Sequence, residues 1–552
     1  MGSDPNIVSW LRRPLGRGLS LLLKVFICAV PAWLFYDLLI DYRLHSDDFA
    51  YVAASRTFGR TMANLFVPHN THIVPAWRLL TWMLCALAGK LANLQLVFAV
   101  AAYGALVLVM LLVGAFVARE TGRAVVGLAA TAGAGTTWLM ASAATWYSAG
   151  QTMWAGLGIL VMLWFLQGWR RQGGTWRLVL AALATWFAAG FWSIGHAAGP
   201  VGAVYLWTDG RPQCRKMAWV PLAATLAAVA IAMALGGRQI NATISFGGRT
   251  TLQAADPVQG VLHTLQAIPE YLVFGNLGLL TETTPGQGAV LTLVLAVAWL
   301  WTVRRRGRLN PLEAAGAALV VISSLVEWTV RGYLPFTSLR GLVPWYQTIP
   351  HIGFILLLAG WCSGQTVAKA PGQAMAPLTR GGAIALILLQ AALFVLHEPR
   401  VEAEFQERVP GMSLEERKTL PIPSLQHLRA VYVASARTTW QNHALARLDR
   451  AEAVARQLGI GRKAIHETFG RLVVPEISDV YDAADMLALP WEGPETNLPR
   501  VRQALGPLIE PEPDPAPPNA ILKELGIRIE RDGTMRDQSP GVPPQRPGGS
   551  GP

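Results

Sequence analysis

Residues 11–40 read LRRPLGRGLSLLLKVFICAVPAWLFYDLLI, and this stretch decides the fold class. The apolar run from 19 to 40 is long enough to cross a bilayer, which takes about 20 apolar residues in a helix. The run is too long for the core of a signal peptide and no A-x-A cleavage site closes it, so we expect an uncleaved membrane anchor. Arg12, Arg13 and Arg17 precede the run. Because basic flanks stay on the cytoplasmic side, residues 1–18 are predicted to be cytoplasmic.

The composition of the chain agrees with this prediction. Of 552 residues, 52% are hydrophobic and 14% are charged, with a net charge of +12. Soluble domains carry about 25% charged residues, so a soluble protein of this size is excluded. The positive charges stand in short clusters between apolar runs, as in cytoplasmic membrane loops. They do not follow one face of a polar domain, which argues against nucleic-acid binding.

Further apolar runs follow the anchor, and basic clusters separate several of them. The runs are 94–118, 124–141, 149–169, 177–193, 194–208, 217–235, 288–303, 311–330, 349–366 and 381–397. The clusters are Arg119/Arg123, Arg170/Arg171/Arg177, Arg211/Arg215/Lys216, Arg304/Arg305/Arg306/Arg308 and Lys369/Arg380. Placing every cluster in the cytoplasm predicts about eleven crossings, with the N-terminus inside and the C-terminus outside. The transmembrane domain is then 19–397, with its main external loops at 41–93, 236–287 and 331–348.

One apolar segment does not fit this count. Residues 73–89 read IVPAWRLLTWMLCALAG and could span, but a crossing there would move all five basic clusters outside. The segment is short, contains Pro75 and Arg78, and has Trp77 and Trp82 near its start. These features are typical of a helix lying at the membrane surface. We therefore predict a juxtamembrane helix in the first external loop.

The character of the chain changes after residue 398, where the charge rises and the apolar runs stop. Apolar residues recur at helical spacing over 424–458, and shorter helices are expected over 463–472 and 479–489. Residues 398–509 are therefore predicted to form a small external helical segment. Residues 510–552 are rich in proline and glycine and are predicted to be disordered.

The first external loop holds the strongest candidate site. His45, Asp47 and Asp48 follow the first crossing, and His69 and His72 precede the juxtamembrane helix. A carboxylate near the low-dielectric boundary has a raised pKa unless it is paired, which suits a general base acting on a hydroxyl group. The alternative is that Asp47 and Asp48 cap a loop helix and are solvated.

The layout of this region resembles the GT-C glycosyltransferases. It has an acidic pair after the first crossing, then a juxtamembrane helix near His69 and Pro75, then many crossings. That superfamily includes the protein O-mannosyltransferases and the bacterial lipid transferases for aminoarabinose and galacturonic acid. The resemblance covers about residues 19–210, and the usual His-Pro-Pro string is absent here. It implies an all-α polytopic GT-C-like bundle, a sugar donor on a polyprenyl phosphate, and Asp47 or Asp48 as catalytic base.

A late external loop carries a second candidate region with Arg331, Arg340 and Tyr346. The guanidinium group is a rigid fork that matches phosphate oxygens, and the resemblance implies that this element faces the lipid phosphate of the donor. Both arginines would equally suit snorkelling to the outer lipid head groups. Glu327 lies at a membrane depth where a carboxylate is functional or paired, here with Arg331. His196 would contact a sugar or the catalytic carboxylate, or be an interfacial polar residue.

The leading hypothesis is a glycosyltransferase in the inner membrane of a bacterium, with a periplasmic C-terminus. Its partners would be a polyprenyl-phosphate-linked sugar, a lipid or glycan acceptor and membrane lipids. No Walker or GxGxxG loop appears, which favours a lipid-linked donor. The resemblance leaves room for a divalent cation, although the sequence shows no ligand set. A lipid or sugar transporter and a noncatalytic membrane scaffold are the alternatives.

Overall fold

The computed structural model describes residues 17–34, 47–55, 57–69, 72–91, 94–243, 285–331 and 344–363. It also describes 385, 389, 392, 396, 527–529 and 535–537. The chain divides into two compact units. The first comprises Met1–Arg43, Thr57–Leu84 and Gln95–Tyr432, and the second comprises Leu44–Arg56, Cys85–Leu94 and Val433–Pro552.

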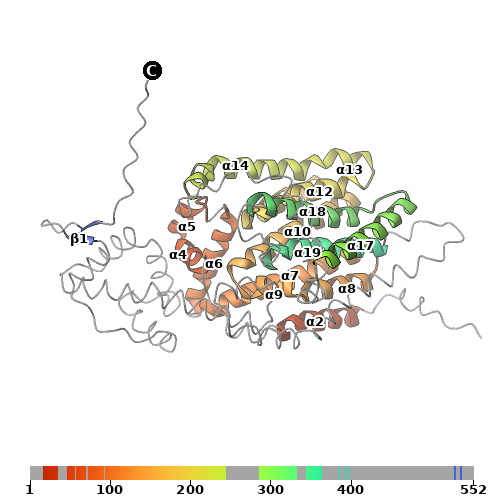
Figure 1. The fold of residues 1–552 in the computed structure, drawn as a ribbon, viewed down its shortest axis with the longest axis horizontal. Coiled ribbons are helices and arrows are strands. Elements are labelled where there is room, and N and C mark those ends of the chain that lie inside the picture. Colours follow the sequence, from red (N-terminus) through yellow and green to blue (C-terminus); the bar gives the residue numbers. More distant parts are fainter. Residues whose placement is uncertain are drawn as a thin grey trace, which may run out of the picture. The chain divides into compact units, whose positions relative to one another are not determined.

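The apolar runs form the helices of the first unit, because in lipid each segment has to satisfy its own backbone polar groups. The elements are α2 (Arg17–Leu34), α5 (Phe58–Asn64), α6 (Pro75–Leu91), α7 (Leu94–Thr121), α8 (Ala124–Gly135), α9 (Trp138–Thr145), η1 (Ser148–Gly150), α10 (Gln151–Gln172), α11 (Thr175–Phe191), η2 (Ser193–Ala197), α12 (Ala198–Trp207), α13 (Pro212–Met217), α14 (Trp219–Thr243), α17 (Pro285–Arg306), α18 (Pro311–Arg331), η6 (Pro344–Gln347) and α19 (Thr348–Ser363). Figure 1 shows α7, α10, α12, α14, α18 and α19 lying with roughly aligned axes.

Helix-to-helix packing in this unit uses small residues. Helix α18 packs along α19 and α12, and α10 packs along α11. At the α18–α19 crossing, a β-carbon on Gly316 would lie 2.7 Å from the carbonyl oxygen of Gly353. One on Gly353 would lie 2.9 Å from the carbonyl oxygen of Gly316. Such close backbone approach is typical of helices that associate in a membrane.

The described residues contain helices suited to a membrane. Three of them, Leu96–Thr121, Ser148–Gln172 and Pro212–Leu235, are long and apolar enough to cross, or up to four if one bent pair counts as a span. Shorter apolar helices are Leu21–Trp33, Thr175–Phe191, Pro311–Val326 and Thr348–Ser363. The count of eleven crossings stays a prediction. For the run 381–397, the structure describes only four separate positions.

The run 194–208 differs from the crossing that the sequence predicts. It forms η2 followed by α12, which has 10 residues. At 1.5 Å per residue, α12 is about 15 Å long, half the hydrocarbon core of a bilayer. Pro200 lies in the first turn of α12. A proline ring clashes with the carbonyl four residues earlier, so the helix cannot extend far upstream of it. By itself, α12 is too short to cross.

The run 124–141 is also not one straight helix. Helices α8 and α9 are bent by 68° at their junction. Thr136 and Thr137 stand at the break, and their hydroxyl groups form hydrogen bonds with the backbone. The Thr136 hydroxyl donates to Ala132 O at 2.7 Å, and the Leu139 amide donates to the Thr137 hydroxyl at 3.3 Å. Threonine competes for helix hydrogen bonds in this way and often bends helices.

The segment 73–89 forms α6, which starts at Pro75 and has 17 residues. Trp77 and Thr81 are fully buried, whereas Met83 is 57% exposed. A helix of this length is about 26 Å long, shorter than the hydrocarbon core. The segment therefore forms a helix with one buried face and one exposed face. Its position at the membrane surface stays a prediction.

The second unit contains α4 (Asp47–Ser55), the part of α6 from Cys85 onward, and a short antiparallel hairpin of β1 (Ile527–Ile529) and β2 (Met535–Asp537). The hairpin falls in the stretch 510–552, and the disorder that the sequence predicts for the rest of this stretch stays a prediction. The alternation of Ile527, Arg528 and Ile529 suits a strand. The helices expected over 424–458, 463–472 and 479–489 lie outside the described residues.

Candidate functional site

Three connecting segments meet in the first unit. They are the residues before α6, the turn η2 after α11, and the turn η6 before α19. Their side chains form the loop cluster, defined as His72, Trp192, Ser193, His196 and Tyr346. Two of its contacts join residues far apart in the chain, between His72 and Ser193 and between Trp192 and Tyr346.

A short backbone pairing holds His72 in place. His69 and His72 exchange two backbone hydrogen bonds, each 2.9 Å long. Arg78 of α6 folds back and donates to the carbonyl of Val67 at 3.0 Å. With its backbone held, His72 places Nδ1 2.6 Å from Oγ of Ser193. Which atom donates depends on the tautomer of the imidazole.

Aromatic rings support the loop cluster. The Trp192 and Tyr346 rings stack with centroids 5.0 Å apart and an angle of 16°. Beside them, Trp77 stacks on Tyr147 at 4.3 Å and meets the edge of Phe191 at 6.1 Å. Rings packed in this way contribute beyond the area they bury. The aromatic layer therefore fixes the ends of α6 and α11 from which the loop cluster extends.

The turn η2 depends on a glycine. A β-carbon on Gly195 would lie 2.0 Å from the carbonyl oxygen of Ala188, so no other residue fits without moving the backbone. This close approach brings His196 against the end of α11. Burial lowers the pKa of His196, which is therefore neutral at pH 7. Its Nδ1 is buried and has no hydrogen-bond partner in the described part of the chain.

The loop cluster consequently combines neutral hydrogen-bonding groups with a stacked aromatic pair. An imidazole and a hydroxyl can each donate and accept. Ligand sites commonly consist of apolar and aromatic walls with a few such polar groups. This composition suits a neutral polyhydroxy ligand better than an anion, because His196 carries no charge at neutral pH.

The predicted base lies at the start of α4, in the second unit. The helix begins at Asp47, so both aspartates lie in its first turn. Asp48, however, is 0% exposed, so the alternative that this residue is solvated is wrong. Tyr51 and Val52 of the same helix are also buried.

The other predicted site residues are placed only in part. Glu327 and Arg331 lie in the last turns of α18, which ends at Arg331. His45 and Arg340 lie outside the described residues. Among the described residues, no three His, Cys, Asp or Glu side chains gather as metal ligands would. We therefore derive no step through a divalent cation.

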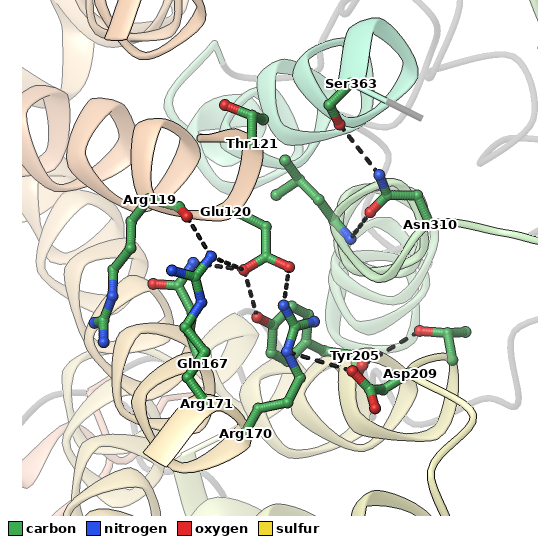
Figure 2. A network of polar contacts seen from close by, with 12 residues as sticks. Arg119, Glu120, Thr121, Gln167, Arg170, Arg171, Tyr205, Asp209, Asn310 and Ser363 are labelled. Carbon is green, nitrogen blue, oxygen red and sulfur yellow. Dashed lines mark hydrogen bonds and ion pairs between the residues drawn. The ribbon is translucent and has the colours of Figure 1, made fainter. Parts of the chain in front are cut away.

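At the other end of α11, the structure has a charged network that the sequence did not predict (Figure 2). We define it as Arg119 and Glu120 of α7, Gln167, Arg170 and Arg171 of α10, Tyr205 of α12, and Asp209. The Glu120 side chain is 6% exposed and that of Arg170 is 10% exposed. A buried ion pair persists only where further hydrogen bonds satisfy both groups.

The Glu120 carboxylate has several donors. Arg170 donates to Oε1, while Gln167 and Tyr205 donate to Oε2 at 2.6 Å and 3.1 Å. Arg170 also pairs with Asp209 at 3.4 Å. The pKa of Asp209 is lowered, because hydrogen bonds from Arg211 and the charge of Arg170 together outweigh the opposing effect of burial. Asp209 is therefore ionised at neutral pH.

This network joins three of the predicted basic clusters. Arg171 donates to the carbonyl of Arg119, and Arg211 donates to the carbonyl of Arg170 at 2.9 Å. The three clusters therefore lie at one end of the first unit, as a common cytoplasmic side requires. The signal that could have revealed the network is Glu120 itself, a carboxylate directly beside Arg119 at the end of an apolar run.

Comparisons with known proteins find a likeness only among solved structures. No family model matches the chain, and no curated protein matches it. Among solved structures, the apo form of an oligosaccharyltransferase from Archaeoglobus fulgidus is similar, at 12% identity and a TM-score of 0.34. The likeness covers 75% of this chain but 61% of that one, so the chain spans about three fifths of the length of its neighbour. At this TM-score, the likeness carries no argument about activity.

Proposed function

We propose that this protein is a GT-C-type membrane glycosyltransferase of a bacterial inner membrane. It takes a sugar from a polyprenyl-phosphate carrier and transfers it to a lipid or glycan acceptor at the periplasmic face. Its N-terminus is cytoplasmic and its C-terminus periplasmic.

The observation that carries this proposal is the complete burial of Asp48 in the helix that follows the first crossing. Burying an ionised carboxylate is expensive, so such groups are retained where they are paired or needed for chemistry. The adjacent Asp47 opens the helix. We therefore assign the role of base to the buried Asp48, a choice that the sequence left open.

The proposed reaction is a displacement at the anomeric carbon of the donor. The acceptor hydroxyl oxygen forms the new bond, and the bond from the anomeric carbon to the phosphate oxygen breaks with its electron pair left on the phosphate. The hydroxyl proton passes to the carboxylate of Asp48. Attack opposite the leaving group inverts the anomeric configuration. Arg331 and Arg340 would stabilise the charge that develops on the phosphate.

The loop cluster supports the proposal through its composition. The neutral His196, the paired His72 and Ser193, and the stacked Trp192 and Tyr346 are groups that suit a sugar or another polyhydroxy compound.

One feature favours the transporter alternative, namely the break between α8 and α9, since broken helices line transport sites. The carbonyls near this break are already occupied, however. His351 of α19 contacts Gly133 O at 2.9 Å, and the Thr348 hydroxyl donates to Leu139 O at 3.4 Å. The break is therefore held by α19, and we retain glycosyl transfer as the proposal.

The test is transfer by purified protein in proteoliposomes, using a panel of synthetic polyprenyl-phosphate sugars. Asp48→Asn is expected to lose about 10²- to 10⁴-fold in kcat, the usual contribution of a general base. Asp47→Asn is the matched control, because it removes the same charge one residue away, and it should stay within about tenfold of wild type. Wild-type rates in Asp48→Asn, or no transfer by the wild-type protein with any donor, would contradict the proposal.

A further inference from the structure

Three arginines in and beside the charged network are not fully neutralised by its carboxylates. They are Arg119 at the end of α7, Arg171 at the end of α10 and Arg177 at the start of α11, and we call them the arginine triad. Arg170 forms the short contact with Glu120. The triad residues belong to neighbouring helices, so their positions are set by the packing of α7, α10 and α11.

Two members of the triad, Arg119 and Arg177, converge above Gly168 of α10. A β-carbon at this glycine would lie 3.4 Å from Nε of Arg177 and 3.7 Å from Nη2 of Arg119. Both cations therefore approach the same point on α10. Arg171 donates from Nη2 to the carbonyl of Arg119, which brings the third cation to the same helix ends. The Arg119 guanidinium lies 4.7 Å from the ring centre of Trp164.

Few negative charges offset these cations. In the described part of the chain, no carboxylate lies within ion-pair distance of Arg119 or Arg177. Arg177 donates only to neutral oxygens, those of Gly173 and Gln172, both at 2.6 Å. Arg171 lies 4.0 Å from Glu120, whose carboxylate Arg170 already occupies. Three like charges in one place repel one another, and a bound anion would remove that repulsion.

An exposed apolar stripe begins beside the triad. Trp176, Val179, Leu183 and Phe187 of α11 are 55%, 53%, 53% and 41% exposed. Their spacing of three and four residues puts them on one face of the helix. The guanidinium of Arg177 lies 4.7 Å from the ring centre of Trp176 at the start of this stripe. The cluster of arginines, which suits an anionic head group, therefore continues directly into a surface that suits acyl chains.

We propose that the arginine triad binds the phosphate of an anionic phospholipid whose acyl chains lie along the exposed stripe of α11. The guanidinium forks provide paired donors that match phosphate oxygens. Trp164 and Trp176 flank the site as interfacial aromatic residues do. This binding does not depend on glycosyl transfer and would hold for a membrane protein of any activity.

The experiment is native mass spectrometry of the full chain released from neutral detergent micelles. It compares phosphatidylglycerol with phosphatidylcholine of the same acyl chains. The wild-type protein should bind phosphatidylglycerol more tightly by about tenfold or more, because only the anionic lipid gains the charge-assisted hydrogen bonds in full. The double variant Arg119→Gln/Arg177→Gln should lose that preference. Arg119→Lys/Arg177→Lys, which keeps the charge but removes the forks, should be intermediate.

The matched control is Arg215→Gln/Lys216→Gln. It removes two exposed positive charges from the same end of the unit but lies outside the triad. This control variant should keep the preference for phosphatidylglycerol within about twofold of the wild-type value, as expected when solvated charges are removed. An equal loss in control and triad variants would overturn the site, and so would equal binding of both lipids by the wild-type protein. Displacement of the lipid by equimolar glycerol phosphate would show a soluble-anion site and overturn the assignment to a phospholipid. Thermal unfolding of each variant shows whether a loss reflects unfolding.

Discussion

The two ends of α11 meet very different surroundings. At its first turn lie Arg177 and the charged network, in which the Glu120 carboxylate has donors from α10 and α12. At its last turn lie Phe191 and then the loop cluster, whose described contacts are a hydrogen bond between an imidazole and a hydroxyl group and a pair of stacked rings. A helix of 17 residues, about 26 Å long, separates them.

From this difference we infer that the charged end serves stability and the loop cluster serves ligand binding. The charged network gives its buried ion pair several hydrogen bonds, as such a pair requires in order to persist, although Nη1 of Arg170 and Oε1 of Gln167 have no partner in the described part of the chain. In the loop cluster, Nδ1 of His196 has no hydrogen-bond partner in the described part of the chain, so it can form a hydrogen bond with a ligand. We therefore expect changes at the charged end to alter the free energy of unfolding, and changes at the loop cluster to alter ligand binding.

The largest expected effect is at the charged end. Glu120→Gln leaves the buried Arg170 without its main counter-charge, which should lower the free energy of unfolding by about 3–5 kcal/mol. Reversible unfolding in mixed micelles measures this. The double change Glu120→Leu/Arg170→Met should recover much of the loss, because no charge is then left buried. An unchanged unfolding midpoint in Glu120→Gln would contradict the structural role of the network.

The next effect concerns the turn that carries the loop cluster. In Gly195→Ala, the new methyl group would meet the carbonyl of Ala188 at 2.0 Å, so the turn has to shift. Overpacking of this kind costs about 1–3 kcal/mol. The free energy of unfolding should fall by this amount. Gly210→Ala has no atom within 4 Å of the new methyl group, and it controls for the residue type, although its φ of +84° adds some strain of its own. Equal free energies of unfolding for wild type and Gly195→Ala would show that η2 has room for the methyl group and would contradict this close approach.

A smaller effect is expected at the pair formed by His72 and Ser193. Ser193→Ala removes a hydrogen bond of 2.6 Å, which contributes about 1 kcal/mol. The imidazole NMR signals of His72 should move, because its Nδ1 loses a partner. Ser324→Ala, at a buried serine on another helix, serves as the control and should leave those signals in place. Unmoved signals in Ser193→Ala would mean that the pair is not formed.

The smallest expected effect is a pH dependence of the free energy of unfolding, caused by His196. Burial lowers the pKa of this residue below its usual value of 6.5, so the unfolded chain binds a proton more readily than the folded one. Stability from this source is complete well above pH 6.5 and is lost as the pH falls through and below that value. Unfolding curves between pH 5 and 8 measure it. His196→Gln should show a flatter dependence than wild type, and an identical slope would exclude His196 as its source.

Much of the bundle follows from local sequence. The apolar run at 94–118 became α7 and the run at 177–193 became α11, each within about three residues, because a helix needs only a continuous apolar segment and its own hydrogen bonds. The break at 136–137 was missed. It depends on threonine hydroxyls and on His351, which lies 218 positions from Gly133.

The candidate site was predictable only as a set of residue types. Sequence reasoning chose His72 and Tyr346 but could not know that Ser193 would contact one and Trp192 the other, since these pairs are far apart in the chain. It chose the Asp47/Asp48 pair but could not decide between buried and solvated side chains. Burial is a property of the packed protein, and Asp48 shows it.

The most direct test compares the two buried carboxylates, Asp48 and Glu120, in one transfer assay with a polyprenyl-phosphate sugar. Rates are expressed per folded molecule, counted by size-exclusion chromatography. We predict that Asp48→Asn folds normally but loses transfer by about 10²-fold or more, the share of a general base. We predict that Glu120→Gln unfolds more easily yet transfers at close to the wild-type rate while folded. The reverse result, with Asp48→Asn active and Glu120→Gln folded but inactive, would contradict the account and move the chemistry to the charged end.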